Sequence, residues 1–390
     1  MTPLEILALV PLVCQIALRL DRKRGWPDEC RLGDAPARDP TRPSPVVFAV
    51  IPARDEAKAL PEALPSVLSQ DYPDLKVVLV DDHSTDGTAE VARRLAREAR
   101  REDRLRVISA PDRPPGWSGK VHAMASGVGA IAAAGEEPPW LLFTDADIRH
   151  RQGSIRSLVA LAERETLDVV SVMVRLRAAE FWERLLIPPF VYFFQLLYPF
   201  RRIRDPRSRV YGAAGGCVLV RRAVLERAGG LERIRGALID DVNLGRILKQ
   251  AGGRTWLGFD PGIESIRGYP GLADVWRMVA RSAFDQLGYS YAMTALVVIA
   301  IMLVLVSPPL VLAAALVAGA PTAALSAAVA WLLSSLAILP AVRHQRVPAA
   351  YAAALPLASL FYALMTAGSA WDHFVGRGGR WKGRVHQAVE

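Results

Sequence analysis

A long stretch without charge constrains this chain more than any other feature. From Tyr291 to Val342 no residue is charged, whereas one membrane-spanning helix needs only roughly 20 residues. The stretch therefore predicts two apolar helices, with 319–321 as the turn between them. A second uncharged run, 347–371, is long enough for a further helix. Helices of a soluble domain keep a polar face and these runs have none, so we expect transmembrane helices over 291–371.

A shorter apolar run occupies residues 1–20. It contains Glu5 and Arg19, and basic residues follow it at 22–24. A cleaved signal peptide has its positive charge before the apolar run. The reverse order here predicts an uncleaved anchor with the following chain in the cytoplasm. The expected location is the bacterial inner (cytoplasmic) membrane, with the middle of the chain facing the cytoplasm.

The positive-inside rule and the number of apolar runs disagree near the C-terminus. Two crossings after residue 290 return the chain to the cytoplasm at Arg343 and Arg346, as the rule requires. A third crossing would place the basic tail, 372–390, outside. Either the run 347–371, which contains two prolines, does not cross fully, or the prolines at 308–309 divide the first run. The sequence leaves both alternatives open.

The middle of the chain has the pattern of an α/β domain. Residues 21–44 are rich in proline and predict a linker. The expected buried strands are the apolar runs 46–51, 75–80, 105–108 and 140–143. The expected helices between and after them are 56–70, 88–101, 120–134 and 242–250. This alternation predicts a mostly parallel sheet over residues 45–285, and ligands bind such sheets at the carboxyl ends of the strands.

Acidic residues follow two of these predicted strands. Asp145 and Asp147 come directly after 140–143, where both could reach one hard cation; such pairs are also common on ordinary surfaces. Asp81 and Asp82 follow 75–80. Their carboxylates could accept hydrogen bonds from a base or a ribose, or they could serve the turn that leads to Asp86, the expected N-cap of the next helix.

Two further segments are candidates for chemistry. The loop 116–120, Gly-Trp-Ser-Gly-Lys, leads into a helix, and Lys120 with the helix N-terminus would favour phosphate. Its spacing is not that of a Walker A loop, and a flexible connection is the alternative. Asp240 and Asp241 precede the helix 242–250, where they could cap it or supply a general base.

An aromatic segment with a basic end lies within about 181–209. The run 190–200 is too short to span a membrane, and arginines follow it at 201–209. Such a segment suits the headgroup layer of a bilayer; a core helix with a solvated basic end is the alternative. The formal net charge of +9 is concentrated near such expected membrane edges, so we expect a lipid bilayer and no nucleic acid as partner.

The order of these pieces resembles the inverting family 2 glycosyltransferases of the GT-A fold. The pieces are 52–56 (PARDE), 80–88 (VDDHSTDGT), the loop 116–120, 145–147 (DAD), 215–216 (GG) and 240–241 (DD). The resemblance covers roughly residues 45–285. A narrower resemblance rests on the N-terminal anchor, the loop 116–120, the stretch 276–281 and the C-terminal apolar runs. It is to the hopene-associated glycosyltransferases of the HpnB type.

The resemblance implies a role for each matching residue. Asp55 and Asp82 would contact the nucleoside, and Lys120 would approach the diphosphate. Asp145 and Asp147 would hold Mg²⁺ or Mn²⁺ on that diphosphate. Further donor contacts are implied at Pro52, Arg54, Glu56, Gly119 and Arg281.

The resemblance also implies the catalytic base and the limits of the activity. Asp241 would take the proton from the acceptor hydroxyl. The family usually has Glu-Asp where this chain has Asp-Asp, so Asp240 stays an alternative. Processive relatives carry a Gln/Arg-x-x-Arg-Trp motif. The nearest match here, 278–282, departs at its first and last positions, which argues against a polymer synthase.

The expected function is therefore a membrane-bound inverting glycosyltransferase. Its donor would be a nucleotide-sugar, with a UDP-sugar as first choice, and its acceptor a membrane lipid, with hopanoid biosynthesis as the specific context. A polyprenyl-phosphate sugar transferase is the first alternative. A non-catalytic membrane scaffold with a degenerate transferase domain is the second, and the intact acids at 82, 145, 147 and 241 argue against it.

Overall fold

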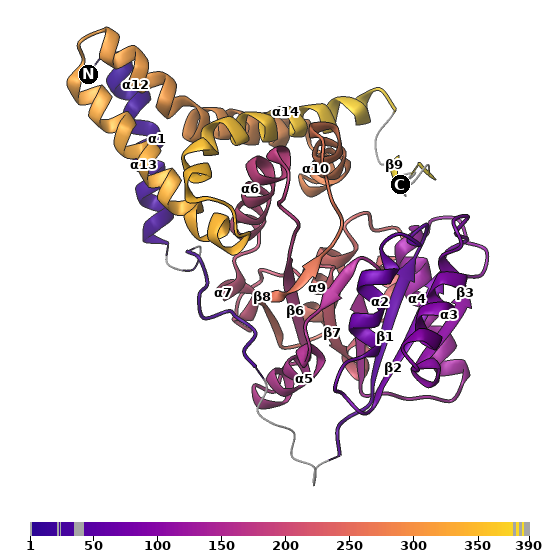
Figure 1. Cartoon of the computed structure of the whole chain (residues 1–390). Coiled ribbons are helices and arrows are strands. Elements are labelled where there is room, and N and C mark those ends of the chain that lie inside the picture. The colour runs from indigo at the N-terminus through magenta and orange to yellow at the C-terminus, as the bar shows by residue number, and fades with distance from the viewer. Residues whose placement is uncertain are drawn as a thin grey trace. The chain divides into compact units, whose positions relative to one another are not determined.

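A computed structural model describes residues 2–21, 23, 25–34 and 43–376, together with the backbone of 380–381 and 384–385. Parts of the predicted linker 21–44 and most of the predicted basic tail 372–390 lie outside these residues. The chain divides into two compact units (Figure 1). The α/β unit comprises mainly 27–176 and 200–267, and the helical unit comprises 1–26, 177–199 and 268–387.

One eight-stranded sheet forms the centre of the α/β unit, in the order β3-β2-β1-β4-β7-β6-β8-β5. The strands are β1 (Val47–Ala53), β2 (Leu75–Asp81), β3 (Leu105–Ser109), β4 (Trp140–Thr144), β5 (Ile148–His150), β6 (Val169–Arg175), β7 (Cys217–Arg221) and β8 (Thr255–Ser265). β7 runs antiparallel to β4 and β6, and β5 antiparallel to β8. The other pairs are parallel, which confirms the predicted mostly parallel α/β sheet.

Helices accompany both faces of this sheet. They are α2 (Leu60–Leu68), α3 (Thr88–Glu98), α4 (Gly119–Ala133), α5 (Ser154–Arg164), α7 (Phe200–Arg204), α8 (Arg222–Arg227) and α9 (Asp240–Gln250). Short 3-10 turns occur at η1 (Glu102–Arg104) and η2 (Leu231–Ile234). In β1, Phe48 and Val50 pack into one core cluster with residues of α4 and α9, whereas Ala49 and Ile51 alternate to the other face and are equally buried. Burial on both faces explains why the strand is apolar throughout.

A glycine sets the distance between α4 and the sheet. A Cβ on Gly127 would lie 2.6 Å from Cγ1 of Val50 and 3.0 Å from Cγ2 of Val80. Only glycine therefore allows α4 to pack this closely on β1 and β2. The close packing fixes the N-terminal end of α4, and with it Lys120, near the ends of these strands.

The strand register brings the functional segments to one edge of the sheet. Ala53 at the end of β1 pairs with Asp81 at the end of β2, and Val50 of β1 pairs with Phe143 of β4. Since these three strands are parallel, the residues that follow them meet at the same edge. That edge is the one at which open α/β sheets bind ligands.

The helical unit contains most of the apolar sequence. Its helices are α1 (Pro3–Leu20), α6 (Phe181–Leu197), α10 (Leu272–Gln286), α11 (Tyr291–Ile301), α12 (Ser307–Val317), α13 (Pro321–His344) and α14 (Leu355–Phe374), with the turns η3 (Met302–Val306) and η4 (Ala349–Ala354). Two short strands, β9 (Arg380–Trp381) and β10 (Arg384–Val385), also belong to it. In the described part of the chain four segments are long and apolar enough to cross a membrane: 3–20, 291–317, 321–344 and 349–374. They indicate a membrane association.

The segment 291–317 continues through its prolines. Pro308 and Pro309 fall in the first turn of α12, where a missing N–H is tolerated. Directly before them, η3 is a π-helical turn. α11 contacts α14, whereas α12 contacts α1 and α13. The prolines therefore do not break the helical course of this run, and the topology of the crossings stays a prediction.

The aromatic segment forms α6, one face of which packs within the helical unit. Leu185 and Leu186 of α6 pack with Val275 of α10 and Tyr362 of α14. The location of this segment in a headgroup layer stays a prediction. The arginines that follow belong to the α/β unit, where Arg201 pairs with Glu29 and Arg204 with Glu165. Residues 177–199 and 268–285, which the sequence analysis included in the domain 45–285, lie in the helical unit.

Candidate functional site

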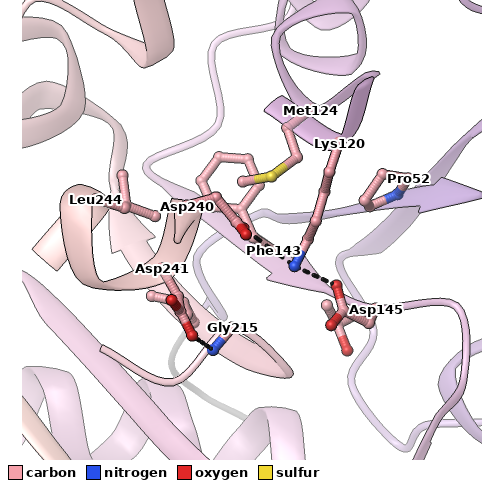
Figure 2. A pocket seen from close by; sticks show the side chains of 11 residues that line it. Pro52, Lys120, Met124, Phe143, Asp145, Gly215, Asp240, Asp241 and Leu244 are labelled. Carbon is pink, nitrogen blue, oxygen red and sulfur yellow. Dashed lines mark hydrogen bonds and ion pairs between the residues drawn. The ribbon is translucent and has the colours of Figure 1, made fainter. Parts of the chain in front are cut away.

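Lys120 is the centre of an acidic cluster at the carboxyl edge of the sheet. Its Nζ lies 2.8 Å from Oδ1 of Asp145 and 3.0 Å from Oδ2 of Asp240. Figure 2 shows the ammonium group reaching between these two carboxylates, which come from the end of β4 and the start of α9. The cluster opens on a pocket lined by Pro52, Lys120, Met124, Phe143, Thr144, Asp145, Gly215, Val218, Asp240, Asp241 and Leu244. A cationic group beside three carboxylates is an arrangement that can accept an anionic ligand and a metal together.

Asp241 is held by two backbone amides. The N–H of Gly215 donates to Oδ2 at 2.8 Å, and the N–H of Val242 donates to Oδ1 at 2.8 Å. Gly215 is close to the whole cluster: a Cβ there would lie 3.2 Å from Oδ2 of Asp241 and 3.2 Å from Nζ of Lys120. The glycine, two residues before β7, therefore leaves room for the side chains of Asp241 and Lys120.

Burial and mutual charge shift the ionisation of this cluster. Burial, reinforced by the charge of Asp240 and opposed by Lys120, raises the pKa of Asp241 to about 6. Burial also raises the pKa of Asp145, although the charge of Lys120 works against it. Burial alone would lower the pKa of Lys120, but the charges of Asp145 and Asp240 outweigh it and raise that pKa above its usual value. Lys120 is thus a permanent cation, and Asp241 titrates close to neutral pH.

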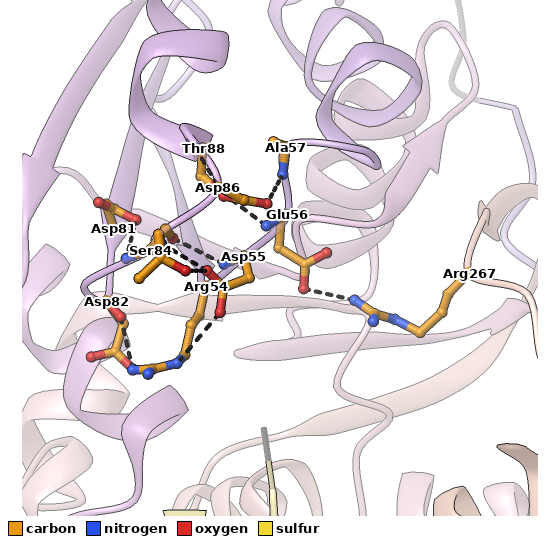
Figure 3. Close-up of polar contacts among 11 residues, drawn as sticks. Arg54, Asp55, Glu56, Ala57, Asp81, Asp82, Ser84, Asp86, Thr88 and Arg267 are labelled. Atoms are coloured by element: carbon orange, nitrogen blue, oxygen red, sulfur yellow. Dashed lines mark hydrogen bonds and ion pairs between the residues drawn. The ribbon is translucent and has the colours of Figure 1, made fainter. Parts of the chain in front are cut away.

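The loops after β1 and β2 are joined at their tips (Figure 3). Arg54 donates through Nη1 to the carbonyl oxygen of Asp82 at 3.0 Å and to its Oδ2 at 3.3 Å. The N–H of Asp55 donates to Oγ of Ser84 at 2.9 Å, and Thr85 returns a bond to Oδ1 of Asp55 at 2.8 Å. Asp55 adopts a φ of 51°, a conformation that non-glycine residues rarely take and that these bonds hold in place. Asp55 and Asp82 therefore lie in one rigid double loop.

The carboxylate of Asp86 bonds to both parts of this double loop, and Asp86 is not the N-cap of α3. Its Oδ2 accepts from the N–H of Ala57 at 2.9 Å, and its Oδ1 accepts from the N–H of Thr88 at 3.1 Å. The N-cap of α3 is Gly87, with a φ of 82°. The N-cap expected at Asp86 is thus displaced by one residue, because the carboxylate is shared between two loops.

Asp147 accepts a hydrogen bond from Arg267, a residue that the sequence motifs did not predict. Oδ2 of Asp147 accepts from Nε of Arg267 at 2.7 Å and from Oγ of Ser265 at 3.3 Å. The Nη2 of Arg267 donates to Oε1 of Glu56 at 2.7 Å, as Figure 3 shows. Arg267 follows the end of β8 by two residues, and a prediction of that strand would have pointed to it.

Asp145 and Asp147 are suited to a divalent metal, but only together with a ligand. Their oxygens are the hard donors that Mg²⁺ and Mn²⁺ prefer, and both already accept a cation, Lys120 or Arg267. Among the described residues no group of three or more His, Cys, Asp or Glu side chains could hold a metal. A metal at this pair would therefore take its remaining ligands from diphosphate oxygens and water.

Most of the predicted site residues lie in the α/β unit. Pro52, Lys120, Asp145, Asp240 and Asp241 line the pocket. Arg54, Asp55 and Asp82 lie in the double loop, Glu56 and Asp147 share Arg267, and Gly119 is the first residue of α4. Arg281 differs, because it lies on α10 in the helical unit.

Comparisons with known proteins agree with this geometry. Residues 48–229 match the model of glycosyl transferase family 2. Glycosyltransferase GlyG of Streptococcus pneumoniae is 26% identical over 127 residues, which are 33% of this chain and 38% of that protein. The uncharacterized glycosyltransferase alr2836 of Nostoc sp. is 32% identical over 127 residues, 33% of this chain and 35% of that protein. The chain thus spans little more than a third of either curated relative.

A solved structure matches over nearly the whole length. The mannosyltransferase PcManGT from Pyrobaculum calidifontis, solved in complex with GDP-Man and Mn²⁺, aligns with a TM-score of 0.55 and 20% identity. The alignment covers 95% of this chain and 99% of that one. At this identity the likeness is one of fold. With the match of residues 48–229 to the glycosyl transferase family 2 model and the mostly parallel sheet, it shows that the α/β unit has the GT-A fold.

Proposed function

We propose that this chain is a membrane-bound, inverting glycosyltransferase that moves a sugar from a nucleoside-diphosphate donor to a lipid acceptor. The observation that supports this best is the cluster of Lys120 with Asp145 and Asp240, in a chain with four apolar helices. The cluster offers a cation and metal-binding carboxylates for a diphosphate. The apolar helices keep the enzyme at the bilayer, where a lipid acceptor is concentrated.

Lys120 is the residue best placed to stabilise the leaving group. Breaking the sugar–phosphate bond leaves negative charge on the diphosphate, and a half-buried, permanently charged ammonium group opposes that charge. The ammonium has three donors and uses two on Asp145 and Asp240, so one stays available for a phosphate oxygen. A divalent metal held by Asp145 and Asp147 would supply further charge neutralisation at the same diphosphate.

Asp241 is the proposed general base. Its pKa of about 6 leaves it ionised near neutral pH yet basic enough to take a proton from an acceptor hydroxyl. Asp240 is engaged by Lys120, and we assign it the role of holding that lysine. The proton would leave the acceptor as its oxygen attacks the anomeric carbon from the face opposite the diphosphate, and a single displacement of this kind inverts that centre.

The donor and the acceptor are the finer parts of the proposal. PcManGT was solved with GDP-Man, which makes GDP-mannose a donor to test beside UDP-sugars. The loop 52–56 and Asp82 would contact the nucleoside. A hopanoid acceptor rests on the resemblance of the loop 116–120, the stretch 276–281 and the apolar runs to hopene-associated glycosyltransferases.

A lipid phosphate is the second candidate acceptor, because of a basic loop that is bonded to the far end of the helix that begins with Asp240 and Asp241. Arg207 and Arg209 are exposed and pair with no described acid. Their loop is fastened to α9, the helix of Asp241, by Lys249, whose Nζ donates to the carbonyl oxygens of Ile203 at 2.7 Å and Val210 at 2.8 Å. Exposed guanidinium groups on a fixed loop suit phosphate.

The test is donor turnover by the full chain in detergent or nanodiscs with Mn²⁺. Release of nucleoside diphosphate is measured for GDP-mannose and a panel of UDP-sugars. Acceptor arms contain a hopanoid polyol, another lipid alcohol or polyprenyl phosphate, and they separate the two acceptor classes. Asp241→Asn is expected to abolish transfer, with Asp168→Asn, a residue outside the pocket, as control. The proposal fails if no donor is bound or turned over and Asp147→Ala changes nothing.

A further inference from the structure

Arg267 lies at the carboxyl edge of the sheet and bonds to two acidic side chains, and the mechanism above does not use it. We infer that it is a positioning residue: it orients the carboxylate of Asp147 for the metal–diphosphate complex. The inference rests on the proposed function, because it needs Asp147 to be a metal ligand.

One guanidinium group joins three strand ends. Nε of Arg267 donates to Oδ2 of Asp147 and Nη2 donates to Oε1 of Glu56, both at 2.7 Å. Arg267 follows β8, Asp147 follows β4 and Glu56 follows β1. The two acidic side chains are 10% and 11% exposed, whereas the arginine side chain is 38% exposed. The acids are thus nearly enclosed, and the arginine reaches them from the solvent side.

The contacts constrain one oxygen of Asp147 and leave the other for a ligand. Oδ2 accepts from both Arg267 and Ser265, whereas no described residue donates to Oδ1. Two donors on a single oxygen oppose rotation of the carboxylate. A ligating carboxylate that is fixed in this way needs less reorganisation on metal binding, and such outer partners typically change metal affinity 10- to 100-fold when they are removed.

The geometry requires arginine rather than any cation. Asp147 and Glu56 are held by different nitrogens of one planar group. A lysine has a single terminal nitrogen on a flexible chain and presents a point charge. Arg267→Lys therefore keeps the charge but loses the bridge, whereas Arg267→Gln loses both. Comparison of these variants separates orientation from simple electrostatics.

A matched control exists in the same sheet. Nε of Arg221 donates to Oδ1 of Asp168 at 3.1 Å, with the side chains 36% and 21% exposed. This pair resembles Arg267–Asp147 in type and exposure. Asp168 directly precedes β6, whereas Arg267 follows β8, which runs parallel to β6, so the control lies at the opposite end of the sheet. Arg221→Gln therefore measures the effect on Mn²⁺ binding of losing an Arg–Asp pair that lies away from the proposed metal site.

The experiment measures Mn²⁺ binding by electron paramagnetic resonance on the full chain in detergent, with Mn²⁺ alone, with Mn²⁺ and GDP, and with Mn²⁺ and UDP. We expect Arg267→Gln and Arg267→Lys both to weaken Mn²⁺ binding in a nucleotide arm by about tenfold or more. The spectrum of the remaining bound Mn²⁺ should change as well. Arg221→Gln should stay within twofold of the wild type. A similar loss of thermal stability in all three variants would not affect this comparison.

Two results would overturn the inference. If Arg267→Lys binds Mn²⁺ as the wild type does, charge is sufficient and orientation plays no part. If Arg267→Gln binds Mn²⁺ equally well or more tightly, the arginine does not assist the metal. Asp147→Asn separates this failure from that of the proposed function. Unchanged Mn²⁺ binding in that variant refutes the metal role of Asp147, whereas lost binding there with normal binding in Arg267→Gln refutes the role of Arg267 alone.

Discussion

Gly215→Ala offers a direct test of how tightly the catalytic cluster is packed. The new methyl group would point at the cluster, 3.2 Å from Cβ and Oδ2 of Asp241 and 3.2 Å from Nζ of Lys120. These contacts are tighter than ordinary van der Waals distances, so the carboxylate and the ammonium must each move by a few tenths of an ångström. The backbone of Gly215 is not in the left-handed region, and alanine causes no strain there.

The expected loss is in catalysis rather than in stability. A misplacement of about 1 Å in an active site can cost about 100-fold in rate, so a shift of a few tenths should cost roughly 3- to 10-fold. A tenfold loss corresponds to about 1.4 kcal/mol in the barrier. Overpacking would cost at least about 1 kcal/mol of stability, but replacing glycine restricts the unfolded chain and returns about 0.4–1 kcal/mol. The net change in stability should therefore be small.

The assay is release of nucleoside diphosphate from the active donor, with thermal unfolding of the same preparations. Gly129→Ala is the matched control, because Gly129 lies in the exposed part of α4 and a Cβ there meets nothing within 4 Å. Alanine is favoured over glycine inside a helix by about 1 kcal/mol. The control should therefore be fully active and slightly more stable.

The reasoning is refuted if Gly215→Ala keeps kcat/KM within twofold of the control. It is also refuted if activity falls only in proportion to the folded fraction, because crowding of Asp241 and Lys120 would then have no catalytic effect.

Further outcomes follow from the same structure. Because the pKa of Asp241 is raised from 3.8 to about 6, the wild type should lose stability as pH rises from about 4 to about 6, by up to about 3 kcal/mol. Asp241→Asn should lack this loss in metal-free unfolding curves, and parallel curves would contradict the shift. Gly245→Ala should destabilise the chain by about 2–3 kcal/mol in unfolding curves, because its Cβ would lie 2.7 Å from the carbonyl carbon of Gly212; an unchanged curve would refute this packing. Ile299→Lys, at an apolar position 60% exposed on α11, should reduce the membrane-bound fraction in cell fractionation, and full retention would argue against lipid contact. Chelation of divalent metal should suppress donor turnover, and Mn²⁺ should restore it.

The sheet was largely predictable because β1, β2 and β4 are mostly buried on both faces. Such strands read as short continuous apolar runs, and 46–51, 75–80, 105–108 and 140–143 match β1 to β4 within three residues at each end. β8 has no such run: Asp260, Pro261 and Gly262 interrupt it. Its pairing with β6 depends on contacts distant in sequence, which local patterns do not encode.

The site residues that belong to short polar segments of the sequence were predictable. A site residue that stands alone in the sequence was not. Lys120, Asp145, Asp240 and Asp241 stand in recognisable segments, and the structure brings them into one cluster. Arg267 stands alone after an unpredicted strand. The burial of α6 was likewise undecided, because an apolar aromatic helix suits a bilayer surface and a protein interior equally well until its neighbours are known.

The π-helical turn at 302–306 gives its segment one place where the length of the chain can change. A π turn holds an extra residue relative to a plain α-helix, and the wider turn takes up that residue, so the helix beyond it keeps its orientation. Deleting one residue within the turn would restore the plain helix and leave Val311 and Ala315 packed with Ala8 and Ala323. Within α11 there is no extra residue to lose, and one α-helical residue corresponds to a rotation of about 100°. A single-codon deletion should therefore be tolerated in the turn and not in α11.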